Sequence, residues 1–240
     1  MLGDLKRREI IQGIGLVTGA ASALALQERS AFGQAAPQAG AKFTYEAKPL
    51  SLDPKAIKGI SEKVLLSHYD NNYVGAVRRL NAIGAQLAEL DFAKTPVFTI
   101  NGLKREQLIA NNSMILHEVY FDSLGGGGAA RGVLLDAIAR DFGSLDRWRA
   151  EYSAIGKAIG GGSGWVILSY SPREKRLVNQ WASDHTTNIA GGRPLLVLDM
   201  YEHAYQMDYG AKAASYVDAF MEAIRWDNVV ALYDRYSREA

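Results

Sequence analysis

The sequence predicts an α+β fold, in which an N-terminal helical hairpin precedes an α/β domain with a three-stranded antiparallel sheet. Three observations support this. Apolar residues recur at helical spacing before residue 125, a glycine run follows at 125–128, and three short apolar stretches lie between residues 165 and 199. With 48% apolar and 22% charged residues, the composition is that of a globular protein. We place the hairpin domain at residues 43–125 and the α/β domain at residues 130–240.

The hairpin prediction depends on two apolar stripes. The first helical pattern starts after Asp53 and repeats at four-residue steps: Ile60, Val64, His68, Asn72, Ala76 and Leu80. The second runs over about 104–124, with an inward stripe of Ile109, Leu116, His117, Tyr120 and Leu124. Because each helix has a single apolar face, the two are expected to pair as an antiparallel hairpin.

The second half changes from helical to strand-like patterning. A helix is predicted over 145–159, followed by glycines at 160–162. Strands are predicted over 165–170, 176–181 and 195–199, and the polar segment 171–175 joins the first two as a hairpin turn. The third stretch is apolar throughout, which indicates a strand buried on both faces. A final helix is predicted over about 208–225.

Residues 1–35 have the features of an export signal. Lys6-Arg7-Arg8 precedes a glycine- and alanine-rich apolar run from Ile10 to Leu26, and small residues follow. The paired arginines are similar to a twin-arginine signal, which predicts a periplasmic or otherwise exported protein. An ordinary secretory signal, an amphipathic helix and a membrane anchor are the alternatives. The apolar run is short for a membrane span, so no stable anchoring is expected after the signal is removed.

Charge and cysteine content exclude several classes. The formal net charge is only +1, without a long basic or acidic run, so we expect no nucleic-acid partner. There is no cysteine, which excludes disulfides, thiolate metal sites and cysteine nucleophiles.

Three of the four histidines and one aspartate carry the chemistry of interest. Asp199 ends the predicted third strand, and His203 lies four residues further on, so both side chains can point at one place. His68 and His117 each lie on the apolar stripe of a predicted helix. Three imidazoles and a carboxylate form a donor set suited to iron or manganese, with zinc also open. The alternative is that these histidines are hydrogen-bonded core residues.

From Phe43 to about Asp234 the chain resembles the iron/manganese superoxide dismutases. The segments that carry the resemblance are Ser67-His68-Tyr69-Asp70, Asn111-Asn112, His117-Glu118-Val119-Tyr120-Phe121, Phe142-Gly143-Ser144, Gly162-Ser163-Gly164-Trp165, Pro194-Leu195-Leu196-Val197-Leu198-Asp199 and Glu202-His203-Ala204-Tyr205. The resemblance implies one Fe or Mn ion per chain, held by His68, His117, Asp199 and His203. It also implies a homodimer in which Glu202 reaches His203 of the partner subunit.

The implied reaction converts two superoxide ions into oxygen and hydrogen peroxide as the metal is reduced and reoxidised.

The residues that surround the four implied ligands depart from the family. Trp165 of the aromatic cage is kept, whereas Phe121 and Tyr201 stand where tryptophan is usual. In the family, a tyrosine and a histidine help to form a gate at the mouth of the funnel that leads to the metal; these positions are Ala76 and Asn72 here. The family also has a glutamine that bonds the metal-bound solvent and comes from one of two positions, which are Ser113 and Gly161 here. The interface tyrosine falls on Gln206 and the funnel arginine on Ala213.

These departures predict dismutation at reduced efficiency. In the family, the histidine at the position of Asn72 and the tyrosine at the position of Gln206 form a hydrogen bond across the dimer interface. A bond between the amides of Asn72 and Gln206 of the partner subunit could replace it. Two alternatives stay open: another redox reaction on a larger substrate, and a non-catalytic metal-binding role on the same fold. His185, beside Asp184, is expected to be exposed in the loop between the second and third strands.

Overall fold

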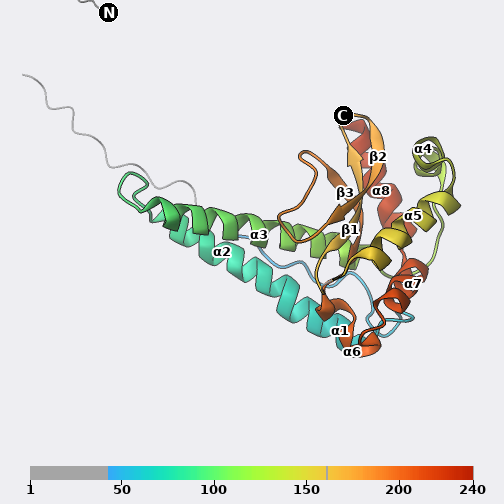
Figure 1. The fold of residues 1–240 in the computed structure, drawn as a ribbon, viewed down its shortest axis with the longest axis horizontal. Helices are drawn as coiled ribbons and strands as arrows, with labels where there is room; N and C mark the ends of the chain where they lie inside the picture. The colour runs from blue at the N-terminus through green and yellow to red at the C-terminus, as the bar shows by residue number, and fades with distance from the viewer. Residues whose placement is uncertain (1–42, 161, 240) are drawn as a thin grey trace, which may run out of the picture. The chain divides into compact units, whose positions relative to one another are not determined.

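The N-terminal part of the described chain is a long helical hairpin. The computed structural model describes residues 43–160 and 162–239, so the predicted export signal lies outside the described residues. Its elements are α1 (Glu62–Ser67), a π-helical turn η1 (His68–Tyr73), α2 (Val74–Ala88) and α3 (Val97–Asp122). Figure 1 shows α2 and α3 side by side, extending away from the sheet.

The second hairpin helix starts earlier than the sequence predicts. It begins at Val97, directly after Pro96, instead of near residue 104. Proline suits a helix start because its missing N–H would have no partner inside the helix. At the other end of the hairpin, the hydroxyl of Ser61 accepts a hydrogen bond from the backbone N–H of Val64 at 3.2 Å and caps α1.

The α+β class and the three-stranded antiparallel sheet are confirmed. The second half contains α4 (Gly132–Phe142), α5 (Leu145–Ala158), β1 (Trp165–Ser171), β2 (Arg176–Ala182), β3 (Arg193–Asp199), a 3₁₀ turn η2 (Glu202–Ala204), α6 (Gln206–Tyr209), α7 (Ala213–Ala223) and α8 (Trp226–Arg238). The strand order is β2-β1-β3, and both pairs are antiparallel. The boundary between two domains near residue 125 stays a prediction.

The prediction of one final helix over 208–225 was wrong. Gly210, at a φ of +54°, ends the short α6, and extended backbone at Ile224 and Arg225 separates α7 from α8. The Arg225 N–H instead donates to the carbonyl of Ser123 at 2.7 Å, which ties this turn to the end of α3. Helix α4 was not predicted from the sequence.

The sheet and α3 together form the wall that carries the site. Residues 195–198 of β3 are completely buried, as their apolar run predicted. β3 packs against α3, and its last residue, Asp199, lies opposite Trp165 at the start of β1. Among the described residues, none of the helices is long and apolar enough to span a membrane.

Candidate metal centre

Four side chains from three parts of the fold converge on one point. One ligand atom from each of His68, His117, Asp199 and His203 lies within 4.8 Å of the other three. The Nε2 atoms of the three histidines lie 3.0, 3.6 and 3.1 Å from Oδ2 of Asp199. His68, His117 and Asp199 are buried, whereas the His203 side chain is 26% exposed.

The π-helical turn places His68 in this group. In a regular α-helix, a residue four positions on is rotated by about 40° from the first. The wider turn of η1, which starts at His68, takes up part of this rotation and keeps the four-residue stripe facing inward. Ala76 and Leu80 are accordingly buried along with His68.

His117 is locked in the tautomer that a metal ligand needs. Its Nδ1 lies 2.7 Å from the carbonyl oxygen of Ser113, one turn earlier in α3. Because a carbonyl only accepts, Nδ1 carries the proton and donates it. The Nε2 atom is then left with a free lone pair, and it points toward Asp199.

The segment after β3 positions Asp199 and His203. Oδ1 of Asp199 accepts the N–H of Tyr201 at 2.8 Å, which leaves Oδ2 for the imidazoles. The N–H of Met200 donates to the carbonyl of Gly164 at 2.9 Å and holds the end of β3 against the start of β1. Only glycine fits at position 164, since its φ is +135° and a Cβ would lie 2.8 Å from the carbonyl oxygen of Ala182.

The electrostatics of the group favour a bound cation. Burial lowers the pKa of His68, and burial with the nearby His68 lowers the pKa of His117 to about 3, so both imidazoles are neutral. Burial alone would raise the pKa of Asp199, but its interactions with His203 and His68 outweigh this and hold the pKa below its ordinary value. The cluster therefore offers three imidazole nitrogens, of which those of His68 and His117 are neutral, and one anionic carboxylate oxygen.

Unpaired buried atoms show that a metal fits here. Nε2 of His68 and Nε2 of His117 are buried without a hydrogen-bond partner, an arrangement that costs free energy unless something else binds them. A metal ion bound by both nitrogens, by Nε2 of His203 and by the carboxylate would satisfy all of them. Imidazole and carboxylate donors suit iron and manganese.

Three of the predicted surrounding residues form an aromatic wall around the ligands. The ring centroid of Phe121 lies 5.1 Å from that of His68, and that of Trp165 lies 5.2 Å from that of His117. Tyr201 stacks on His203 at 5.3 Å. These rings keep water away from the donor atoms and limit ligand movement.

Asn72 contacts a ligand within its own chain. Its amide nitrogen lies 3.0 Å from Nδ1 of His203. If Nε2 of His203 binds a metal, Nδ1 carries the proton, and the amide can turn its oxygen toward Nδ1 as the acceptor. Asn72 can therefore orient the most exposed ligand without help from a partner subunit.

The expectation that His185 is exposed was wrong. His185 is half-buried, its ring stacks on Tyr201 with centroids 4.8 Å apart, and its Nδ1 accepts the Trp165 indole N–H at 3.0 Å. The side-chain amide of Asn112 donates to the His185 carbonyl at 2.6 Å and draws the loop inward. Burial lowers the pKa of His185, which is therefore neutral near pH 7.

Other positions that depart from the family pattern lie in varied surroundings. Ala76 is buried in the core, and the Ser113 hydroxyl lies 3.3 Å from Nδ1 of His117. Ala213 is half-buried at the start of α7, and Gly161 lies outside the described residues. Glu202 and Gln206 are exposed in the single chain, so their contacts with a partner subunit stay predictions.

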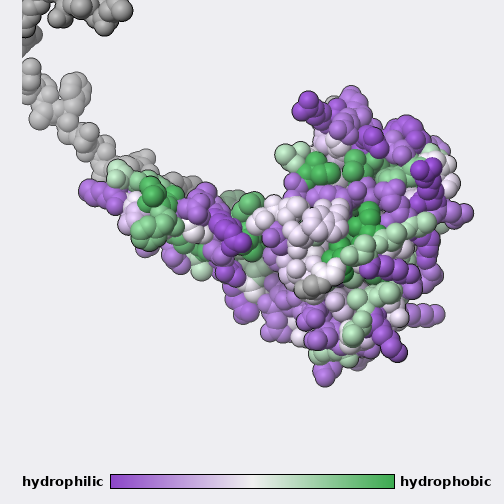
Figure 2. Space-filling view, viewed as in Figure 1, coloured by the Kyte–Doolittle hydropathy of each residue, from purple (hydrophilic) through white to green (hydrophobic). Residues whose placement is uncertain are grey.

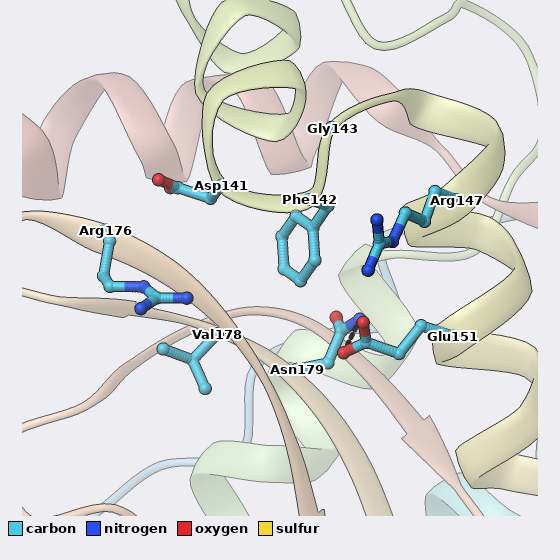
Figure 3. A pocket seen from close by; sticks show the side chains of 8 residues that line it. All are labelled: Asp141, Phe142, Gly143, Arg147, Glu151, Arg176, Val178 and Asn179. Carbon is cyan, nitrogen blue, oxygen red and sulfur yellow. Dashed lines mark hydrogen bonds between the residues drawn. The ribbon is translucent and has the colours of Figure 1, made fainter.

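A pocket of about 330 Å³ elsewhere in the chain is separate from this centre. It lies between α4, α5 and β2, and its lining residues are Asp141, Phe142, Gly143, Arg147, Glu151, Arg176, Val178 and Asn179. Figure 3 shows the Phe142 ring between the two arginine side chains, with Glu151 accepting from the Asn179 amide at 3.1 Å. Its lining includes none of the four converging residues, and its charges are of both signs.

The fold and the donor set together define a metalloprotein with one buried, mononuclear metal centre. Residues 130–232 match the family described as iron/manganese superoxide dismutases, C-terminal domain. The chain is 67% identical over 189 residues to "Superoxide dismutase [Fe]" of Cupriavidus metallidurans, an alignment that covers 79% of this chain and 96% of that protein. It is 37% identical to "Superoxide dismutase [Mn] 2" of Halobacterium salinarum, over 79% of this chain and 95% of that protein. The chain belongs to the iron/manganese superoxide dismutase family.

Proposed function

We propose that this protein dismutes superoxide to oxygen and hydrogen peroxide in the periplasm, with one iron or manganese ion held by His68, His117, Asp199 and His203. The convergence of these four donors carries the proposal, because the unpaired Nε2 atoms of His68 and His117 call for a metal. The high identity to a protein named as an iron superoxide dismutase supports the reaction. The bound ion supplies one-electron oxidation and reduction.

The protein's own residues keep bulk water away from the metal and determine the side from which a small anion can reach it. Because His203 is the only partly exposed member of the four, a small anion reaches the centre from its side. On that side Tyr201 stacks between the rings of His203 and His185, which narrows the approach. A site this enclosed favours a small substrate such as superoxide.

We propose that dismutation is slower than is usual for the family, because Asn72 and Gln206 do not titrate near neutral pH and so relay protons poorly. Restoring the family's residues together (Asn72→His, Ala76→Tyr and Gln206→Tyr) is expected to raise turnover several-fold. It is also expected to shorten any phase of the reaction in which the product peroxide stays bound and inhibits the enzyme. Pulse radiolysis on metal-replete proteins measures both. Ala76 is buried, so equal metal content in parent and variant must be established first. A parent that already works near the diffusion limit would contradict the proposal.

We propose export through the twin-arginine route, which carries folded proteins with their metal. Arg7→Lys combined with Arg8→Lys keeps the charge but removes the arginine pair, so unprocessed precursor is expected to accumulate in the cytoplasm. Cell fractionation and immunoblotting measure its distribution, and Lys6→Arg serves as the control that should export normally. Normal export of the double variant would point to the general secretory route.

A further inference from the structure

The free end of the α2–α3 hairpin exposes large apolar side chains that the fold does not use. Phe92, Val97 and Phe98 are 58%, 81% and 75% exposed, and they lie within seven consecutive positions. Figure 2 shows hydrophobic atoms gathered at the end of the projection that α2 and α3 form. Scattered exposed apolar residues are common, but a cluster of this kind marks an interaction surface.

The turn that presents this cluster is well braced. The carbonyl of Asp91 accepts the Lys94 N–H at 3.0 Å and the Thr95 hydroxyl at 2.8 Å, while its carboxylate accepts the Ala93 N–H at 3.1 Å. Pro96 then leads into α3. Hydrogen bonds, rather than burial of the aromatic rings, therefore determine the shape of the turn, and the apolar side chains are left available to a partner.

The route of the chain indicates what covers the cluster. Phe43, where the described chain starts, lines a cavity of about 250 Å³ together with Leu87 and Ala88 at the same end of the hairpin. Sixteen residues separate Phe43 from Leu26, the last residue of the predicted signal's apolar run, and a chain of this length reaches at most about 55 Å. A precursor whose signal has entered a bilayer thus keeps the hairpin end within reach of that bilayer.

We propose that residues 92–98 dock on a lipid bilayer in the precursor, as a second contact beside the signal. The proposal rests on the proposed export. One weak apolar contact gives only marginal, reversible membrane binding, whereas two together hold a protein firmly. After the signal is removed, the hairpin end is the one remaining contact with the bilayer, so the mature protein dissociates from it. Docking therefore keeps the folded precursor at the membrane until it is exported.

Flotation of the full chain with vesicles of phosphatidylethanolamine and phosphatidylglycerol tests this. Val97→Asp combined with Phe98→Asp is expected to weaken vesicle binding by about tenfold or more, since two apolar side chains no longer enter the lipid. Val133→Asp is the matched control, because Val133 is 57% exposed on α4, far along the chain from the hairpin end, and should bind as the parent does. If the aspartates lower metal content or thermal stability, serine at both positions replaces them.

Two results would overturn the proposal. Parent-like vesicle binding by the double variant would show that the signal alone accounts for membrane association. A change of oligomeric state in the double variant without lipid, measured by light scattering, would show that a second copy covers the cluster. The vesicles contain no translocation machinery and no superoxide, so neither result depends on the export route or on dismutation.

Discussion

Replacing Asp199 by alanine is expected to abolish tight metal binding and to lower the melting temperature by about 10 °C relative to the metal-loaded parent. Asp199 supplies the only negative charge among the four donors, and its Oδ2 lies within 3.6 Å of all three imidazole Nε2 atoms. A metal present at a thousand times its Kd stabilises the folded state by about 4 kcal/mol. In a domain of this size, this corresponds to the stated shift in Tm.

Elemental analysis and calorimetry of the purified variants measure both effects. Asp199→Asn keeps the shape of the side chain and removes only its charge, so it separates loss of metal binding from loss of packing. Asp136→Ala is the control, because Asp136 is exposed on α4 and should leave metal content and stability unchanged. Full metal content in both Asp199 variants would show that the ion binds elsewhere.

Replacing Asn72 by leucine is expected to weaken metal binding by about 10- to 100-fold, the usual cost of losing a residue that orients a metal-bound histidine. Leucine has a similar volume but offers no acceptor to Nδ1 of His203, which Asn72 now contacts at 3.0 Å. Competition with a chelator of known affinity measures the change.

Asn71→Leu is the matched control for this substitution. Asn71 is exposed, and its amide donates to the backbone carbonyl of Ser67 at 2.9 Å instead of meeting a ligand. We expect parent-like metal affinity in this variant. If Asn72→Leu also binds metal as tightly as the parent, the orientation of His203 comes from another group, such as Glu202 of the partner subunit.

The hairpin and the sheet could be predicted because their signals are local. The helical stripes through His68 and His117, the wholly apolar run of β3 and the Asp199-to-His203 spacing are all visible in the sequence. The family resemblance then assigned all four residues to one metal site. The π-helical turn carries no sequence signal of its own. It was not predicted, although a stripe that keeps strictly to four-residue steps does not stay on one face of a regular α-helix.

The errors arose where long-range contacts decide the structure. His185 is drawn inward by Asn112, 73 positions earlier, and a single histidine in a polar loop gives no sign of such a bond. The break between α7 and α8 has neither glycine nor proline at Ile224 or Arg225. It depends on the bond from the Arg225 N–H to Ser123 at the end of α3. Tertiary hydrogen bonds of this kind override local propensity.

Superoxide decay after pulse radiolysis, measured on samples of known iron and manganese content, tests the central claim most directly. We predict catalytic decay whose rate rises in proportion to the metal bound, up to one ion per chain. Metal-free protein and the Asp199→Asn variant should leave superoxide to its spontaneous decay. A parent that holds one metal per chain yet does not accelerate the decay would contradict the account, and would mean that the family's metal centre serves another purpose in this protein.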